Sequence, residues 1–178
     1  MFDIENTTII AIDIQEKLVN MLSDRDFLVQ NCTKILKAAS ILNIDTILTE
    51  QYPKGLGSTI DCIKEIEDFN TIEKTTFSAL KTSDFESEFN KLNNKNVIVF
   101  GIETHICVLQ TALDLLNKNY NVYILEDCCA SRSEHQKNIS LELLKQSGCK
   151  IITLEIALFE FLKSSKHPNF KEIQALIK

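Results

Sequence analysis

Three residues whose side chains could act together in chemistry lie far apart in the chain, at or just after runs of strand-like residues. Asp13 follows TTIIAI, Lys74 follows a short strand-like stretch, and Cys107 comes a few residues after NVIVF. A thiolate is a strong nucleophile, a carboxylate can accept the thiol proton, and a nearby ammonium group stabilises the thiolate. If the fold brings them together, these side chains are suited to attack on a carbonyl carbon.

Each of the three residues also has an ordinary structural interpretation. Most free cysteines are buried packing residues, an aspartate after a strand commonly forms a turn, and a single lysine is usually solvated. In the helix predicted over residues 105–116, however, Cys107 lies on the polar side. The residues that share its face are Gln110, Thr111 and Asp114. Thr104 is a predicted N-cap, which would place Cys107 in the first turn, where the helix dipole favours a thiolate.

Strand-like and helical patterns of apolar residues alternate along the chain. The predicted strands span residues 7–14, 45–49, 70–73, 96–100, 122–125 and 150–154. The predicted helices span residues 27–42, 60–66, 85–92, 105–116, 135–147, 157–163 and 170–177. This alternation predicts a single α/β domain over residues 1–178, a three-layer (αβα) Rossmann-like sandwich. Its mostly parallel sheet is expected to have about six strands in the order 3-2-1-4-5-6.

Ligands of such sheets bind beyond the carboxyl ends of the strands, where loops carry specificity. The predicted pocket residues are Gln15, Tyr52, Leu56, Phe77, His105 and Arg132. Arg132 could clamp a substrate carboxylate, or it could form a salt bridge or an oligomer contact. His105 points to a different part of the helix from Cys107, so a pocket-lining or structural role is expected. For Phe77, core packing is the equal alternative.

Composition argues against several classes of partner. The net charge is -6, and the lysines and arginines are scattered, which speaks against nucleic acid as a partner. The longest apolar stretches have the length of strands and the amino terminus is acidic, so neither a membrane segment nor a targeting signal is expected. The six cysteines show no C-x-x-C spacing, which favours a reducing, cytoplasmic location.

Three blocks of sequence resemble the isochorismatase-like cysteine hydrolase superfamily. They are AIDIQ at 11–15, EKTTFSAL at 73–80 and GIETHICVLQTALDLL at 101–116. Further blocks are similar to those of isochorismatase domain-containing proteins, namely TEQYPKGLGST at 49–59, DCCASRS at 127–133 and the carboxyl-terminal HPNFKEIQALIK. The resemblance spans nearly the whole chain and supplies an acid, a lysine and a cysteine in the order that the family has them.

The resemblance implies a role for each matching residue. Asp13 would be the general base, Lys74 the cation that orders the site, and Cys107 the nucleophile. A cis peptide would join Ile102 to Glu103, and the backbone N–H groups of Glu103 and Cys107 would form an oxyanion hole. The implied reaction is hydrolysis of a C–N bond in a small molecule through a thioester, without a cofactor. The family also implies a homo-oligomer.

Departures from the family narrow these expectations. Nicotinamidases bind a metal through Asp-x-His after the second strand, whereas TEQYPKG here contains no histidine. The chain has only three histidines, none with a partner at ligand spacing, so no metal is expected. Retention of Cys107 favours an amide over the vinyl ether of isochorismate. Vinyl ether hydrolysis remains an alternative, as does a non-catalytic oligomeric binding or scaffold protein with a vestigial site.

Overall fold

A six-stranded sheet forms the centre of the computed structural model, which describes residues 1–178. The strands are β1 Thr7–Ile12, β2 Asp45–Gln51, β3 Asn70–Lys74, β4 Asn96–Ile102, β5 Asn121–Ala130 and β6 Lys150–Ile152. Their order is β3-β2-β1-β4-β5-β6, and every neighbouring pair is parallel. The predicted fold class and strand order are therefore confirmed.

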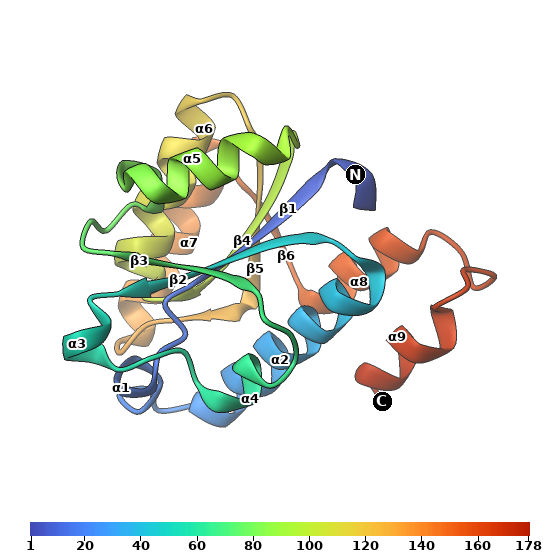
Figure 1. Ribbon diagram of the computed structural model, residues 1–178, viewed down its shortest axis with the longest axis horizontal. Coiled ribbons are helices and arrows are strands. Elements are labelled where there is room, and N and C mark those ends of the chain that lie inside the picture. The colour runs from blue at the N-terminus through green and yellow to red at the C-terminus, as the bar shows by residue number, and fades with distance from the viewer.

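Helices cover both faces of the sheet (Figure 1). They are α1 Glu16–Val19, α2 Arg25–Leu42, α3 Pro53–Leu56, α4 Asp61–Lys64, α5 Ser83–Leu92, α6 Leu109–Asn117, α7 Glu134–Ser147, α8 Leu154–Leu162 and α9 Phe170–Leu176. The helices α5, α6 and α7 lie on one face, and α2 and α8 lie on the other, with α9 beside α2 (Figure 1). None of the helices has the length and hydropathy that a membrane crossing requires.

The central strands are apolar because they are enclosed on both sides. Every residue of β1 and of β4 is buried, which explains why TTIIAI and NVIVFGI show no alternation of apolar and polar residues. Fully burying one isoleucine or valine side chain contributes about 1.5–3 kcal/mol. The two strands therefore form a rigid platform, and Asp13 and the segment that carries Cys107 leave this platform at the same edge.

Gly101 allows the end of β4 to approach β1 closely. Its φ is +128°, and a Cβ atom at this position would lie 2.0 Å from the carbonyl oxygen of Ile12. Only glycine fits such a position, because it has no side chain to clash with the neighbouring backbone. The residue opposite Gly101 in β1 is Ile12, which directly precedes Asp13. This close approach brings the segment after β4 next to Asp13.

The start of the helix that carries Cys107 differs from the prediction. Residues Thr104–Val108 form a π-helical turn before α6, in which the N–H of Val108 donates to the carbonyl of Glu103 at 3.3 Å. The predicted N-cap role of Thr104 is wrong, because Thr104 lies inside this turn and Glu103 precedes it. The hydroxyl of Thr104 is buried and has no hydrogen-bond partner.

The fifth strand is longer than its apolar core suggested. The prediction ended it at Leu125, whereas β5 continues to Ala130. Cys128 and Cys129 are consequently buried within the strand, and all six cysteines of the chain are free. The extension pairs Ala130 with Ile102, so the ends of β4 and β5 reach the same level of the sheet.

Candidate active site

Asp13 and Lys74 meet at the carboxyl edge of the sheet as a buried ion pair. Asp13 follows β1 in a left-handed conformation with φ 52°, and Lys74 is the last residue of β3. The Nζ of Lys74 lies 2.7 Å from Oδ2 of Asp13, and neither side chain is exposed to solvent. The intervening strand β2 supplies Thr49, whose hydroxyl donates to Oδ1 of Asp13 at 2.6 Å. Both carboxylate oxygens are thus held by charge-assisted hydrogen bonds.

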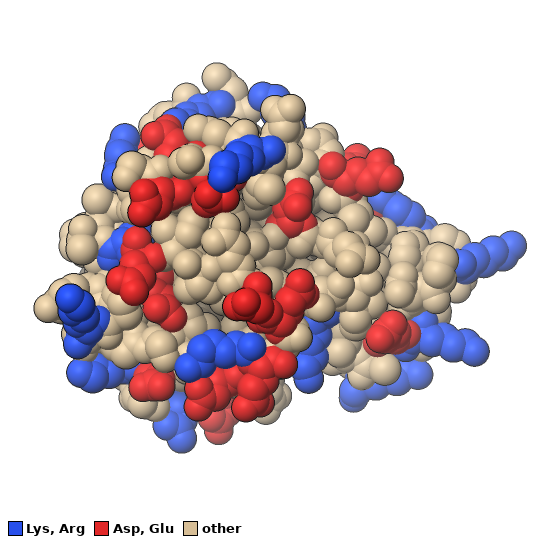
Figure 2. All heavy atoms as spheres, in the orientation of Figure 1, with Lys and Arg blue, Asp and Glu red and all other residues tan.

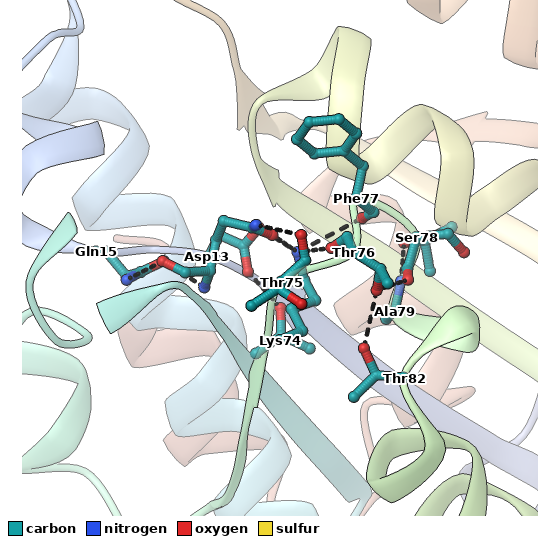
Figure 3. Close-up of polar contacts among 12 residues, drawn as sticks. Asp13, Gln15, Lys74, Thr75, Thr76, Phe77, Ser78, Ala79 and Thr82 are labelled. Carbon is teal, nitrogen blue, oxygen red and sulfur yellow. Dashed lines mark hydrogen bonds and ion pairs between the residues drawn. The ribbon is translucent and has the colours of Figure 1, made fainter. Parts of the chain in front are cut away.

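The ammonium group of Lys74 is surrounded by acceptors from the protein itself (Figure 3). Besides Asp13, it donates to Oε1 of Gln51 at 2.7 Å and to the carbonyl of Thr76 at 3.3 Å, with the carbonyl of Phe77 at 3.5 Å. An ammonium group has three N–H donors, and these contacts use all of them. Lys74 is therefore placed to fix Asp13 and the segment that follows β3.

The thiol of Cys107 is enclosed and close to both charged groups. Burial raises the pKa of Cys107 to about 12, the charge of Asp13 acts in the same direction, and the charge of Lys74 opposes it. Burial and the carboxylate of Asp13 thus act against the thiolate that the sequence predicted, whereas the ammonium group of Lys74 favours it. A thiol with a pKa raised in this way keeps its proton at neutral pH.

The polar face predicted for the helix of Cys107 is not a solvated surface. The hydroxyl of Thr111 accepts from the N–H of Ala79 at 3.0 Å, and Oδ2 of Asp114 accepts from the hydroxyl of Ser78 at 2.7 Å. Both partners belong to the loop that follows Lys74 in the chain. The polar side of α6 thus ties this loop to the helix, and only Gln110 of the predicted face is exposed.

Gln15 holds the backbone of Gln51, whose side chain in turn contacts Lys74. Gln15 is fully buried, and its amide donates to the carbonyls of Gln51 at 3.1 Å and Gly57 at 2.6 Å and accepts from the N–H of Gln51 at 2.8 Å. The predicted pocket role of Gln15 is wrong, because these backbone contacts occupy its amide. Gln51 was absent from the predicted site, although its place at the end of the second strand was a usable signal.

Arg132 and His105 contact neighbouring loops. The Nη1 of Arg132 lies 2.8 Å from Oε2 of Glu103, so of the interpretations offered for Arg132 the salt bridge is the one that the structure contains. The Nδ1 of His105 lies 2.9 Å from the hydroxyl of Ser131. The peptide bond between Ile102 and Glu103 is cis. Glu103 thus has a definite side-chain contact in addition to its place beside this bond.

A cavity of about 520 Å³ opens beside the end of β3. It is lined by Tyr52, Pro53, Lys54, Glu73, Lys74, Thr75, Thr76, Lys81, Thr82 and Ser83. Of the predicted pocket residues, only Tyr52 is among them. Leu56 packs against the apolar core instead, and Phe77 is about half exposed, with its ring directed away from Asp13 and Lys74 (Figure 3). Neither Cys107 nor Asp13 lines this cavity.

The titratable side chains near Asp13 do not form a metal-ligand set. No group of three or more histidine, cysteine, aspartate or glutamate side chains is arranged to hold a metal ion. The residue types gathered around Asp13 are instead a lysine, a threonine and a cysteine, a set whose chemistry suits proton transfer and nucleophilic attack.

Known proteins share both the sequence and this fold. A family model described as the isochorismatase domain matches residues 7–156. Isochorismatase domain-containing protein 2 of Xenopus laevis is 38% identical over 166 residues, covering 93% of this chain and 80% of the relative. A secreted isochorismatase effector of Phytophthora sojae is 34% identical, covering 97% of this chain and 85% of the relative.

A solved structure agrees over almost the full length. The MAR1 ribonuclease from Caenorhabditis elegans superposes with a TM-score of 0.93 at 36% sequence identity, covering 99% of this chain and 91% of that one. The match of the family model over most of the chain, together with these relatives, shows that the chain belongs to the isochorismatase-like hydrolase family.

Proposed function

We propose that this protein is a metal-independent cysteine hydrolase that cleaves a C–N bond, in an amide or a related group, of a small molecule. The observation that carries the proposal is the buried Asp13–Lys74 ion pair beside the buried thiol of Cys107. A buried carboxylate, Asp13, is held by Lys74 and Thr49 and acts electrostatically on the buried thiol of Cys107. A protonated thiol next to a fixed carboxylate is the arrangement that general-base activation of a nucleophile needs.

In the proposed reaction, the sulfur of Cys107 attacks the carbonyl carbon while Asp13 accepts the thiol proton. The C–N bond then breaks, and Asp13 gives the proton to the departing nitrogen, which leaves as ammonia or an amine. A water molecule, deprotonated by Asp13, hydrolyses the resulting thioester and restores the thiol. The backbone N–H groups of Glu103 and Cys107 are proposed to stabilise the negative oxygen of each tetrahedral intermediate.

Lys74 is proposed to act through Asp13 rather than on the substrate. Its three N–H donors already have partners in Asp13, Gln51 and the loop after β3. It keeps the carboxylate oriented toward the thiol and offsets part of the negative charge that makes ionisation of Cys107 unfavourable.

The ribonuclease name of the Caenorhabditis elegans protein raises phosphodiester hydrolysis as another candidate. The net charge of this chain is -6, and on the face shown in Figure 2 acidic and basic side chains are interspersed, with no continuous basic surface. Proteins that bind RNA normally offer such a surface to the phosphates. The charge distribution therefore favours a small substrate over RNA.

A screen with matched variants tests the proposal. Wild-type protein, Cys107→Ala and Asp13→Asn are assayed for release of ammonia or amine from a panel of small amides and imides, with isochorismate and a short RNA included. Cys62→Ser is the control, because Cys62 is an exposed free cysteine whose side chain contacts Thr33 of α2 and none of the proposed catalytic residues. We expect activity on a member of the amide panel that Cys62→Ser retains and the other two variants lose. Full activity in Cys107→Ala would contradict the mechanism.

We further propose a homo-oligomer in a reducing, cytoplasmic setting. Large apolar side chains are exposed on α7, at Ile139 and Leu143, and on α8, at Ile156 and Phe159, and contacts between subunits would cover such groups. Six free cysteines suit a reducing compartment. Light scattering during size exclusion measures the assembly, and a mass of one chain, 20.3 kDa, would contradict this part of the proposal.

A further inference from the structure

The main-chain pairing of β4 with β5 ends at Ile102 and Ala130. After this pair, side-chain contacts join the two segments. Glu103 receives two hydrogen bonds from Arg132, one from its backbone N–H to Oε1 at 3.1 Å and one from Nη1 to Oε2 at 2.8 Å. The ring of His105 and the hydroxyl of Ser131 form a second link at 2.9 Å. The turn that leads to Cys107 is thereby fastened to the segment after β5.

The two partners of the charged link differ in exposure. The side chain of Glu103 is 6% exposed, whereas that of Arg132 is 58% exposed. A carboxylate that is nearly buried needs donors for both of its oxygens, and Arg132 supplies both. Removal of the guanidinium would leave Oε2 of Glu103 without its donor and would release Glu103 toward solvent. The position of Glu103 is thus set by Arg132, which lies 29 residues further along the chain.

We propose that Glu103 and Arg132 form a lock that positions the backbone of residues 103–107 for catalysis. The inference rests on the proposed function and adds Arg132 and the carboxylate of Glu103 as positioning residues. In this role the lock keeps the N–H groups of Glu103 and Cys107 directed at one point, where the oxygen of an attacked carbonyl group comes to lie. It acts on the oxyanion hole and leaves the thiol and Asp13 in place.

Two reagents distinguish an effect on the oxyanion hole from an effect on the thiol of Cys107. Iodoacetamide alkylates the thiol by displacing iodide from a saturated carbon, so no oxyanion forms. Propanal adds to the thiol: the S–C bond forms, the π electrons of the carbonyl group move onto its oxygen as a negative charge, and Asp13 keeps the thiol proton. Only the second adduct requires the oxyanion hole. Propanal labelled with ¹³C at its carbonyl carbon reports the adduct by NMR, and Cys107→Ala supplies the background.

The experiment compares Arg132→Gln, Arg132→Lys and Glu103→Gln with Arg25→Gln, all in a Cys62→Ser background that removes the exposed thiol. Arg25 is a matched control, because it is the other arginine of the chain, is 56% exposed and contacts an exposed carboxylate, Asp26, at 3.4 Å. Thermal unfolding of each variant confirms that it is folded. The iodoacetamide rate at Cys107 and the propanal affinity are measured for each.

We expect Arg132→Gln and Glu103→Gln to weaken the propanal adduct about tenfold or more, in line with the cost of misplaced catalytic groups. The alkylation rate should stay unchanged, Arg132→Lys should restore part of the affinity, and Arg25→Gln should match the parent. The lock would be overturned if the parent forms the propanal adduct and Arg132→Gln forms it equally well. It would also be overturned if Arg132→Gln weakened the propanal adduct and slowed the alkylation to the same extent. Neither outcome would contradict the proposed hydrolase function. Absence of a propanal adduct at Cys107 in the parent would contradict the hydrolase and the lock together.

Discussion

The ammonium group of Lys74 lies 2.7 Å from Oδ2 of Asp13, and both side chains are completely buried. A buried ion pair is costly to form, and removing one partner leaves an uncompensated charge in the interior. This pair therefore links stability and function, since the same carboxylate is the proposed base for Cys107.

Loss of Lys74 should destabilise the fold strongly. Lys74→Met leaves Asp13 buried without its cation, at an expected cost of about 3–5 kcal/mol in the free energy of unfolding. Asp13→Asn/Lys74→Met should be more stable than Lys74→Met, because no buried charge remains. Urea unfolding of the single and double variants measures both effects. A double variant as unstable as the sum of the two singles would contradict the interpretation of the pair.

Loss of the Thr49 hydroxyl should impair the proposed role of Asp13 as a base, whereas loss of the Thr46 hydroxyl in the same strand should not. Thr49→Val removes a hydrogen bond to a carboxylate, expected to cost about 1.5–3 kcal/mol and to reduce turnover. Thr46 donates to the carbonyl of Ile44 at 2.8 Å and makes no contact with the site, so Thr46→Val is the control, with an expected cost of about 0.5–1.5 kcal/mol. Equal losses of turnover in the two variants would argue against a role of Thr49 in holding the base.

Gly101 should tolerate no side chain. Gly101→Ala would bring Cβ to 2.0 Å from the carbonyl oxygen of Ile12, and we expect a loss of about 4 kcal/mol or more in the free energy of unfolding. Gly148 has a similar φ of +110°, but no neighbouring atom lies within 4 Å of the place that a Cβ would take, so Gly148→Ala should cost only about 1–2 kcal/mol. Chemical denaturation measures the loss of stability in both variants. Equal losses would contradict the account, because the positive φ alone, without the close approach to Ile12, would then explain the cost at Gly101.

Stability should fall in alkaline solution because of buried thiols. Burial raises the pKa of Cys129 to about 12, from an ordinary value of 9.0, which corresponds to about 4 kcal/mol. Below pH 9 the thiol is protonated in both the folded and the unfolded protein, so its full contribution to the free energy of unfolding is present. As pH rises from 9 toward 12, the unfolded chain loses the proton first, and the free energy of unfolding decreases. Cys129→Ala should show a shallower decrease over this range; an unchanged slope would contradict the effect of burial.

The sheet and the edge at which Asp13 and Lys74 lie could be predicted from the sequence because β1 and β4 are uninterrupted apolar runs. Such runs suit strands enclosed on both faces, and the residues that follow parallel strands converge at one edge. Asp13 and Lys74 were therefore expected to meet, and their ion pair has that geometry.

Features that depend on contacts between distant segments escaped prediction. The π-helical turn at Thr104–Val108 follows Glu103, which Arg132 holds from 29 residues further along the chain, and no local pattern encodes that contact. The buried role of Gln15 depends on the loop around Gly57 folding back over it. The raised pKa of Cys107 reflects burial, which helical periodicity around one residue did not reveal.

The most direct test of the proposed nucleophile uses p-nitrophenyl acetate and Cys62→Ser protein, which lacks the exposed thiol. Attack by Cys107 should transfer the acetyl group to sulfur and release p-nitrophenolate in a rapid burst of one per chain, with peptide mass spectrometry placing the thioester on Cys107. The same protein carrying Cys107→Ala should give no burst. A burst of equal size in that variant, or an acetyl group on another residue, would contradict the assignment of Cys107 as the nucleophile.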